Sequence, residues 1–113
     1  MLQYLKLSVS IIALNLLLMN IQDVLKSETH TIIDVRSTDE FNGGHVKGAI
    51  NIPLDQLPEK LEEVKKMPHP VVLCCASGSR SRQAHVYLSQ HGIANTYNGG
   101  SWIEINELKS KSA

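Results

Sequence analysis

Short apolar runs alternate with amphipathic segments along the chain, and this alternation limits the folds that the sequence can adopt. The short apolar run Val71–Cys74 follows Pro68 and Pro70 and is typical of a buried strand. Strands are predicted at Thr31–Val35, Ala49–Asn51, Val71–Cys74 and Ile93–Tyr97. Helices are predicted at Leu14–Lys26, Ser37–Gly43, Leu54–Lys66, Arg82–His91 and Trp102–Lys109. Strands separated by helices imply an α/β fold in which a mainly parallel sheet carries helices on both faces.

Length and composition narrow the function as well as the fold. A chain of 113 residues fits one domain, and a hydrophobic content of 42% is ordinary for a globular protein. Eleven basic and eleven acidic residues leave no net charge, so we expect no nucleic-acid partner. The two adjacent cysteines cannot build a disulfide framework, and a free thiol fits a reducing compartment. The histidines are scattered without ligand spacing, so we expect no metal site.

The N-terminal segment allows several interpretations. Leu7–Met19 is largely apolar, but the run is shorter than the ~20 apolar residues of a membrane-spanning helix. A single lysine precedes it and no small-residue cleavage site follows, so a membrane or secretory role is disfavoured. We expect residues 1–18 to form an extension with an edge strand at Leu5–Ile12, residues 19–113 to form the domain, and the protein to be cytoplasmic. Export or anchoring through residues 5–19, and self-association into a homodimer, stay open as alternatives.

Cys75 lies where the predicted strand Val71–Cys74 ends, and the residues after it are small as far as Arg80. A tight turn into a helix can direct main-chain N–H groups and the positive end of the helix dipole at an anion. Gly78 permits the backbone angles that such a turn needs, and Arg80 adds a planar cation suited to an oxyanion. We therefore expect Cys75 to be a nucleophile with a depressed pKa. The alternative is a Cys75 that only packs as a small buried hydrophobe.

Cys74 is expected to differ from its neighbour. Adjacent residues of a strand point to opposite sides of the sheet, so the two thiols cannot face the same pocket. A disulfide between immediate neighbours would need strained geometry. Cys74 is therefore predicted to pack in the core.

Three further segments carry motifs in a fixed order. Ile32–Arg36 ends in Asp-Val-Arg, Gly44–Pro53 reads Gly-His-Val-Lys-Gly-Ala-Ile-Asn-Ile-Pro, and Asn98–Trp102 reads Asn-Gly-Gly-Ser-Trp. With the Cys75 loop, these segments resemble the rhodanese family of sulfurtransferases in its single-domain form, although the tryptophan comes earlier than in many members. The resemblance covers about residues 21–108. It implies a rhodanese-like three-layer sandwich, an α/β fold whose central, mainly parallel sheet has about five strands.

The resemblance also implies a role for each matching residue. Cys75 is implied as the sulfur-accepting nucleophile. The implied anion cradle consists of Ala76, Ser77, Gly78, Ser79 and Arg80. Within it, Arg80 would hold the donor. The implied scaffold residues are Asp34, Arg36, Glu40 and His45. We expect Arg36 to pair with Glu40, and the spacing of Ser37 and Glu40 independently predicts a capping box at the start of a helix.

Loop length separates sulfur transfer from related chemistry. Four residues lie between Cys75 and Arg80. The dual-specificity phosphatases of the cell cycle and the arsenate reductases of the same architecture resemble this fold but carry five, which widens the cradle for phosphate or arsenate. Phosphatases also need a general acid for the leaving group, and no acidic residue lies in this loop or directly after it. A phosphatase or arsenate reductase is therefore the less favoured alternative.

The predicted function is that of a thiosulfate sulfurtransferase without a cofactor. It would move a sulfane sulfur from thiosulfate or a persulfide donor, through a persulfide on Cys75, to a thiol or to cyanide. The alternative from another class is a non-catalytic persulfide carrier in a sulfur relay, with another protein as sulfur donor or acceptor.

Overall fold

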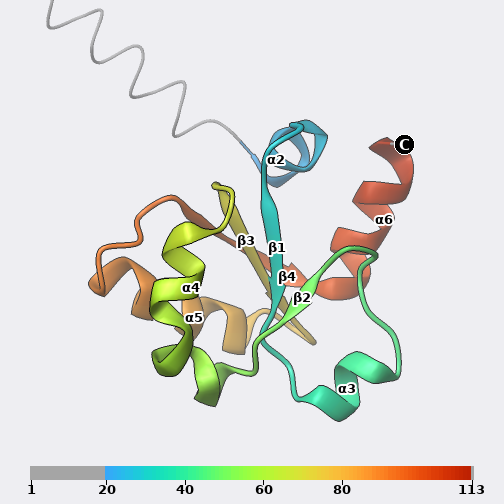
Figure 1. The fold of residues 1–113 in the computed structure, drawn as a ribbon. Helices are drawn as coiled ribbons and strands as arrows, with labels where there is room; N and C mark the ends of the chain where they lie inside the picture. The colour runs from blue at the N-terminus through green and yellow to red at the C-terminus, as the bar shows by residue number, and fades with distance from the viewer. Residues whose placement is uncertain (1–19, 113) are drawn as a thin grey trace, which may run out of the picture.

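The computed structural model of the protein describes residues 20–112, whose strands form one parallel sheet (Figure 1). The strands are β1 (Thr31–Asp34), β2 (Ile50–Asn51), β3 (Val71–Cys75) and β4 (Thr96–Ser101). Their order across the sheet is β2-β1-β3-β4, and every neighbouring pair is parallel. All four strands therefore end at the same edge of the sheet, where ligands bind in folds of this class.

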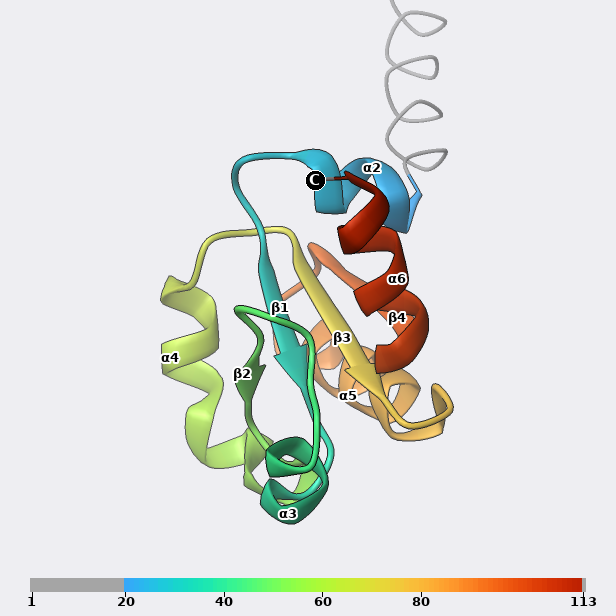
Figure 2. The same cartoon turned by 90° about the vertical axis from the view of Figure 1, so that its right-hand side faces the viewer.

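Helices cover both faces of the sheet and complete three layers. The helical segments are α2 (Ile21–Lys26), α3 (Thr38–Asn42), the 3-10 segment η1 (Leu54–Lys60), α4 (Leu61–Lys66), α5 (Ser79–Gln90) and α6 (Trp102–Ser112). In Figure 1, α4 and α5 lie to the left of the sheet, α6 lies to its right and α2 lies above it, and Figure 2 shows the same elements after a quarter turn. The residues of α2 pack in the same apolar cluster as α6. In both views α3 lies beyond the carboxyl ends of the strands. The predicted α/β fold is confirmed.

The number of strands is lower than predicted. About five were expected, whereas the part of the chain from 20 to 112 has four. The additional strand was expected at Leu5–Ile12, which lies outside the described residues, as do the expectations for residues 1–18 and 5–19. The helix predicted at Leu14–Lys26 differs from the structure at Asn20, which is extended with a ψ of 170° and precedes α2. The Asn20 side chain caps α2 by accepting a main-chain N–H at 3.0 Å, so a helix begins at Ile21.

One strand begins later than predicted. The run at Ile93–Tyr97 was expected to form a strand, but β4 starts at Thr96. The N–H of Ile93 instead donates to the carbonyl of Leu88 at 2.9 Å, in the turn that ends α5. Gly92 has a φ of 84°, the left-handed conformation that commonly ends helices. Ile93 is therefore part of a helix end that packs into the core.

Two helices also differ from their predicted bounds. The helix predicted over Leu54–Lys66 is η1 followed by α4, and Pro58, which has no N–H to donate, lies within η1. The helix predicted from Arg82 begins at Ser79. Its first turn therefore reaches the residues of the predicted cradle.

The side chains of β3 alternate between two apolar clusters. The α5-side cluster includes Val71, Leu73, Cys75, Ile33, Val35, Leu57, Val64, Ala84 and Leu88. The α6-side cluster includes Val72, Cys74, Val24, Leu25, Ile32, Val46 and Ile105. Every residue of β3 is buried because both faces of this central strand are covered. The prediction that Cys74 packs in the core, on the face opposite Cys75, is confirmed.

A bulge interrupts the pairing of β3 with β4 beside the predicted site. Leu73 pairs with Asn98 but Cys74 pairs with Gly100, which makes Gly99 the extra residue of β4. A Cβ on Gly99 would lie only 2.8 Å from the nearest core side-chain carbon, so the bulge accommodates glycine alone. Asn98, the residue before the bulge, hydrogen-bonds to the segment that begins α5.

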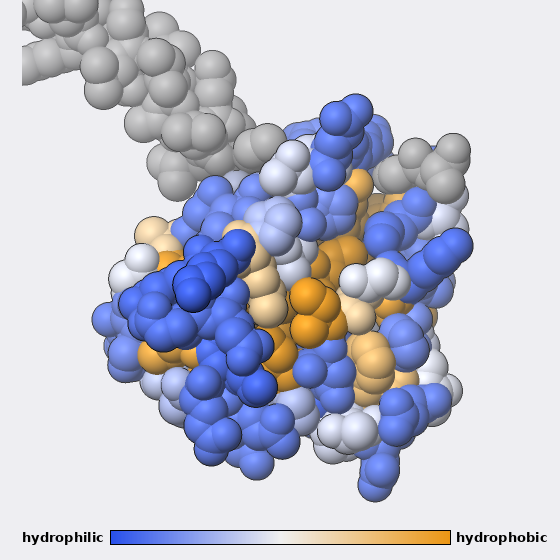
Figure 3. Space-filling view, viewed as in Figure 1, coloured by the Kyte–Doolittle hydropathy of each residue, from blue (hydrophilic) through white to orange (hydrophobic). Residues whose placement is uncertain are grey.

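The surface is mainly hydrophilic, with apolar atoms gathered near the middle of the face in Figure 3, where Figure 1 shows β2. Ile50 of this short edge strand remains 41% exposed. Among the helices between residues 20 and 112, none combines the length and the apolar character needed to cross a membrane.

Candidate active site

Cys75 is the last residue of β3, and its sulfur accepts a hydrogen bond from the turn that follows. The N–H of Gly78 donates to Cys75 Sγ at a distance of 2.9 Å. Gly78 has a φ of 103° and a ψ of −10° and is the N-cap residue of α5. This left-handed conformation is open to glycine at little cost, and it turns the main chain so that the N–H faces the sulfur.

Ser81, in the first turn of α5, contributes a hydroxyl to the same sulfur. Its Oγ lies 3.5 Å from Cys75 Sγ, 2.6 Å from Oδ1 of Asn98 and 3.1 Å from the carbonyl oxygen of Gly78. A hydroxyl has one hydrogen to donate, so it can serve only one of these acceptors at a time. Asn98 therefore shares the Ser81 hydroxyl with the sulfur.

These contacts lower the pKa of Cys75. Burial alone raises the pKa of a thiol, because it disfavours the charged thiolate. The Ser81 hydroxyl and the main-chain N–H groups of Ser81, Gly78 and Ser77 oppose this effect, and the net shift of the pKa is downward. The sulfur is therefore held as a thiolate more readily than an ordinary cysteine sulfur.

The mouth of the site is made by small residues. Ala76, Ser77 and Ser79 are exposed, whereas Cys75 beneath them is 1% exposed. The thiolate thus lies at the floor of the loop, and a reacting sulfur atom must pass these small side chains to reach it.

Cys74 lies in a different environment although it adjoins Cys75. It is fully buried in the α6-side cluster. Burial, followed by the nearby carboxylate of Asp34, raises the pKa of Cys74 to about 12. This thiol stays protonated near neutral pH, so only one of the two cysteines is suited to nucleophilic attack.

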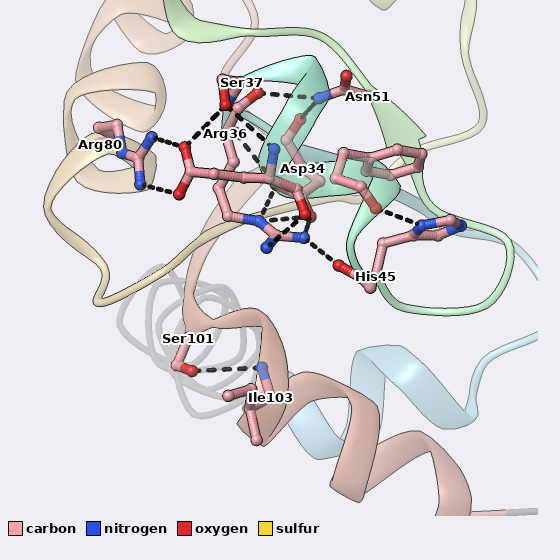
Figure 4. A network of polar contacts seen from close by, with 11 residues as sticks. Asp34, Arg36, Ser37, His45, Asn51, Arg80, Ser101 and Ile103 are labelled. Carbon is pink, nitrogen blue, oxygen red and sulfur yellow. Dashed lines mark hydrogen bonds and ion pairs between the residues drawn. The ribbon is translucent and has the colours of Figure 1, made fainter.

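Arg80 of the cradle is bound to a residue from α3. Its Nη1 donates to Oε1 of Glu40 at 2.7 Å and its Nη2 to Oε2 at 3.0 Å, a two-pronged ion pair that Figure 4 shows reaching from α5 to α3. The resemblance implied that Arg80 holds the donor, but in this structure its guanidinium faces the Glu40 carboxylate. Beside Arg80, between the starts of α3 and η1, lies a groove of about 520 Å³.

Arg36 has a different partner from the one expected. Its Nε and Nη2 donate to the carboxylate of Asp34, the Nη2 contact measuring 2.7 Å, and both side chains are nearly inaccessible to solvent (Figure 4). The expected pairing of Arg36 with the Glu40 carboxylate is wrong, because Arg36 reaches only the main-chain carbonyl of Glu40, at 3.4 Å. Arg36 also donates to the carbonyl of Gly44 at 2.7 Å and stacks on Trp102 at 4.6 Å. The buried pair thereby joins the end of β1, α3, the loop at Gly44 and the start of α6.

His45 and Asn51 support the loops around this ion pair. His45 Nδ1 lies 2.8 Å from the carbonyl oxygen of Phe41, and the two rings stack at 3.7 Å. Asn51 Nδ2 donates to the carbonyl oxygens of Asp34 and Arg36, each at 3.0 Å. These contacts involve main-chain groups and neighbouring rings, and they lie on the β1 and β2 side of the site, away from the sulfur.

Sequence reasoning did not identify Ser81 and Asn98 as site residues. Ser81 directly follows Arg80, so its position in the first turn of a helix that starts at Ser79 would have placed it beside Cys75. For Asn98 the sequence gives no such signal, because its contact with Ser81 depends on the pairing of β4 with β3 and on the bulge. Within residues 20–112 there is no cluster of His, Cys, Asp and Glu side chains that could hold a metal ion.

Comparison with known proteins identifies the family of the chain. The rhodanese-like domain family matches residues 19–102. The chain belongs to the rhodanese-like family. Over 80 residues it is 36% identical to the thiosulfate sulfurtransferase PspE of Escherichia coli, covering 70% of this chain and 77% of PspE.

Two further similarities bear on the fold and on the extent of the match. The protein YqhL of Bacillus subtilis, which is uncharacterized, is 43% identical over 82 residues, covering 71% of this chain. The chain spans 64% of the length of YqhL, less than two thirds. A structure of a rhodanese with anions from E. coli superposes with a TM-score of 0.61 at 34% identity, covering 66% of this chain and 89% of that one.

Proposed function

We propose that this rhodanese-like protein transfers a sulfane sulfur through a persulfide on Cys75. The observation that carries the proposal is the Gly78 N–H, which donates to Cys75 Sγ at 2.9 Å in a site that lowers the pKa of this thiol. A thiolate held by inward N–H groups is both a nucleophile and a site where a terminal sulfur anion is stabilised.

The first step loads the sulfur. The Cys75 thiolate attacks the outer sulfur of thiosulfate or the terminal sulfur of a persulfide, a new S–S bond forms, and the S–S bond of the donor breaks. The electron pair of the broken bond leaves with sulfite, or with the thiolate of a persulfide donor, and no proton is transferred. The negative charge then lies on the terminal sulfur of Cys75, within reach of the N–H groups of the loop.

The second step unloads it. A thiolate or cyanide attacks the terminal sulfur, and the S–S bond to Cys75 breaks with its electron pair returning to Sγ. Because the lowered pKa also makes the Cys75 thiolate a good leaving group, the same hydrogen bonds assist both steps.

A persulfide carrier without rapid turnover is the second candidate. It is favoured by the pairing of Arg80 with Glu40, because a guanidinium bound to a carboxylate attracts small anionic donors less. A cyanide-dependent thiosulfate assay separates the candidates: turnover indicates the enzyme, whereas loading of Cys75 only by a protein persulfide indicates the carrier.

The central test is mass spectrometry after treatment with thiosulfate or a low-molecular-weight persulfide. We expect one added sulfur on the peptide at Cys75 and none at Cys74. Cys75→Ser should abolish both loading and transfer, while Cys74→Ala, the matched control, should change activity less than about threefold because alanine fits the same apolar cluster. An added sulfur on Cys74 alone would refute the proposal.

A further inference from the structure

The only basic side chain of the cradle segment 76–80 already has an anionic partner within the protein. Arg80 and Glu40 share two hydrogen bonds of 2.7 and 3.0 Å, although their side chains remain 36% and 39% exposed. The carboxylate therefore occupies the planar edge of the guanidinium that an oxyanion would otherwise use.

Glu40 is also fixed from its own helix. Its Oε1 accepts the N–H of Ser37 at 3.2 Å and the hydroxyl of Ser37 at 3.1 Å, while the N–H of Glu40 donates to Ser37 Oγ at 3.2 Å. This capping box holds the carboxylate beside Arg80 before any ligand arrives. Less conformational entropy is then lost in forming the ion pair than with two free side chains.

We propose that Glu40 is a specificity-determining residue, which competes with anionic donors for Arg80 and so disfavours dianions such as thiosulfate relative to monoanionic donors. The inference rests on the proposed sulfur transfer and names the class of donor for it. A donor that approaches Cys75 meets a neutral ion pair in place of a free cation. The Glu40 carboxylate cancels attraction that Arg80 would otherwise give, and a dianion loses about twice as much Coulomb energy from this as a monoanion.

Glu40→Gln tests the charge with little change of shape. Glutamine also forms capping boxes at this helix position, so α3 should be retained. The matched control is Glu63→Gln on α4, which removes an equal charge from an exposed pair with Lys60. We expect KM for thiosulfate to fall about five- to tenfold in Glu40→Gln, from the loss of one close charge, and to stay unchanged in the control.

Two donors that differ by one charge test the selectivity. Methanethiosulfonate carries the same outer sulfur as thiosulfate but a single negative charge. Its KM should fall only about two- to threefold in Glu40→Gln, because a monoanion has half the Coulomb interaction of a dianion with the same carboxylate. Equal KM changes for the two donors, or no change for either, would overturn the proposed selectivity.

Sulfate provides a measurement that does not depend on sulfur transfer, since it is a dianion with no sulfur atom to donate. In thermal unfolding with increasing sulfate, Glu40→Gln should gain more in Tm than the wild type and Glu63→Gln. Equal gains in all three would contradict competition by Glu40. If Cys75 takes no sulfur in any variant but sulfate still distinguishes Glu40→Gln, the proposed function fails while the competition for Arg80 stands.

Discussion

Cys74 and Cys75 are neighbours in the chain but lie in two chemically different regions. Both are buried, with 0% and 1% of their surface exposed, so burial does not distinguish them. The region around Cys75 directs N–H groups and a hydroxyl at the sulfur, whereas Cys74 lies in the α6-side cluster near the carboxylate of Asp34. Hydrogen-bond donors aimed at the sulfur, which outweigh its removal from water, therefore set the reactivity of each thiol.

Alkylation should show the largest difference between the two regions. At pH 7 we expect iodoacetamide to modify Cys75 on the order of 100-fold or more faster than Cys74, because the pKa of Cys74 is about 12 and that of Cys75 is lowered. Peptide mapping over time measures both rates. Modification of the two cysteines at similar rates would contradict the claim that their surroundings give them different reactivity.

Gly99→Ala should disturb the packing around Cys74. The new Cβ would lie 2.8 Å from Cγ1 of Val72 and 3.0 Å from Cδ1 of Ile105, both in the α6-side cluster. We expect a loss of about 1–3 kcal/mol in the free energy of unfolding, measured in urea. Gly43→Ala is the control, since its nearest contact would be an ordinary 3.4 Å.

Ser81→Ala should act on the Cys75 region alone. Loss of the hydroxyl 3.5 Å from Sγ removes one hydrogen bond that lowers the pKa of Cys75, so the pKa should rise. The thiolate is present above this pKa and lost as the pH falls through it, so the midpoint of the alkylation profile moves to higher pH. At pH 7 we expect a roughly tenfold slower reaction. An unchanged midpoint would show that the Ser81 hydroxyl donates its hydrogen bond to Asn98 and not to the Cys75 sulfur.

The smallest effect expected is on the acid stability of the ion pair at the mouth of the site. Arg80, followed by the N–H of Ser37, lowers the pKa of Glu40 from 4.5 to about 2. A carboxyl with a depressed folded pKa contributes stability above its unfolded pKa, and this contribution is lost as the pH falls through the folded value. Urea midpoints measured from about pH 4.5 down to 2 should therefore fall more steeply for the wild type than for Glu40→Gln. Parallel curves would contradict the role of Arg80.

Local patterns in the sequence predicted most of the strands and helices. The apolar run at the start of β3, the alternation of strands with helices, and the capping box of Ser37 and Glu40 each depend on neighbouring residues, and each is present in the structure. The exceptions are also local. After the turn at Gly92, β4 begins later than predicted, and the predicted helix over Leu54–Lys66 is divided where Pro58 lies within η1. The spacing of apolar residues does not reveal either effect.

The cradle was predictable in outline because Cys75, Gly78 and Arg80 lie close together in the chain. The partners of its polar side chains were not. Glu40 is forty residues from Arg80, and only the order of the strands brings α3 beside α5. Arg36 was expected to form a local ion pair with Glu40, but Arg36 precedes α3 and turns back to Asp34.

The buried pair of Asp34 and Arg36 has a consequence for the evolution of such sites. It fastens the end of β1, the Gly44 loop and Trp102 into one junction, and Asn51 ties β2 to the same point. The turn after Cys75 contributes none of the hydrogen bonds that the structure gives to Asp34 and Arg36. A longer turn, or one with other side chains, would change which atom fits over the sulfur without disturbing the contacts of Asp34 and Arg36. The same fold can therefore acquire new reactions by exchange of a few residues in this turn.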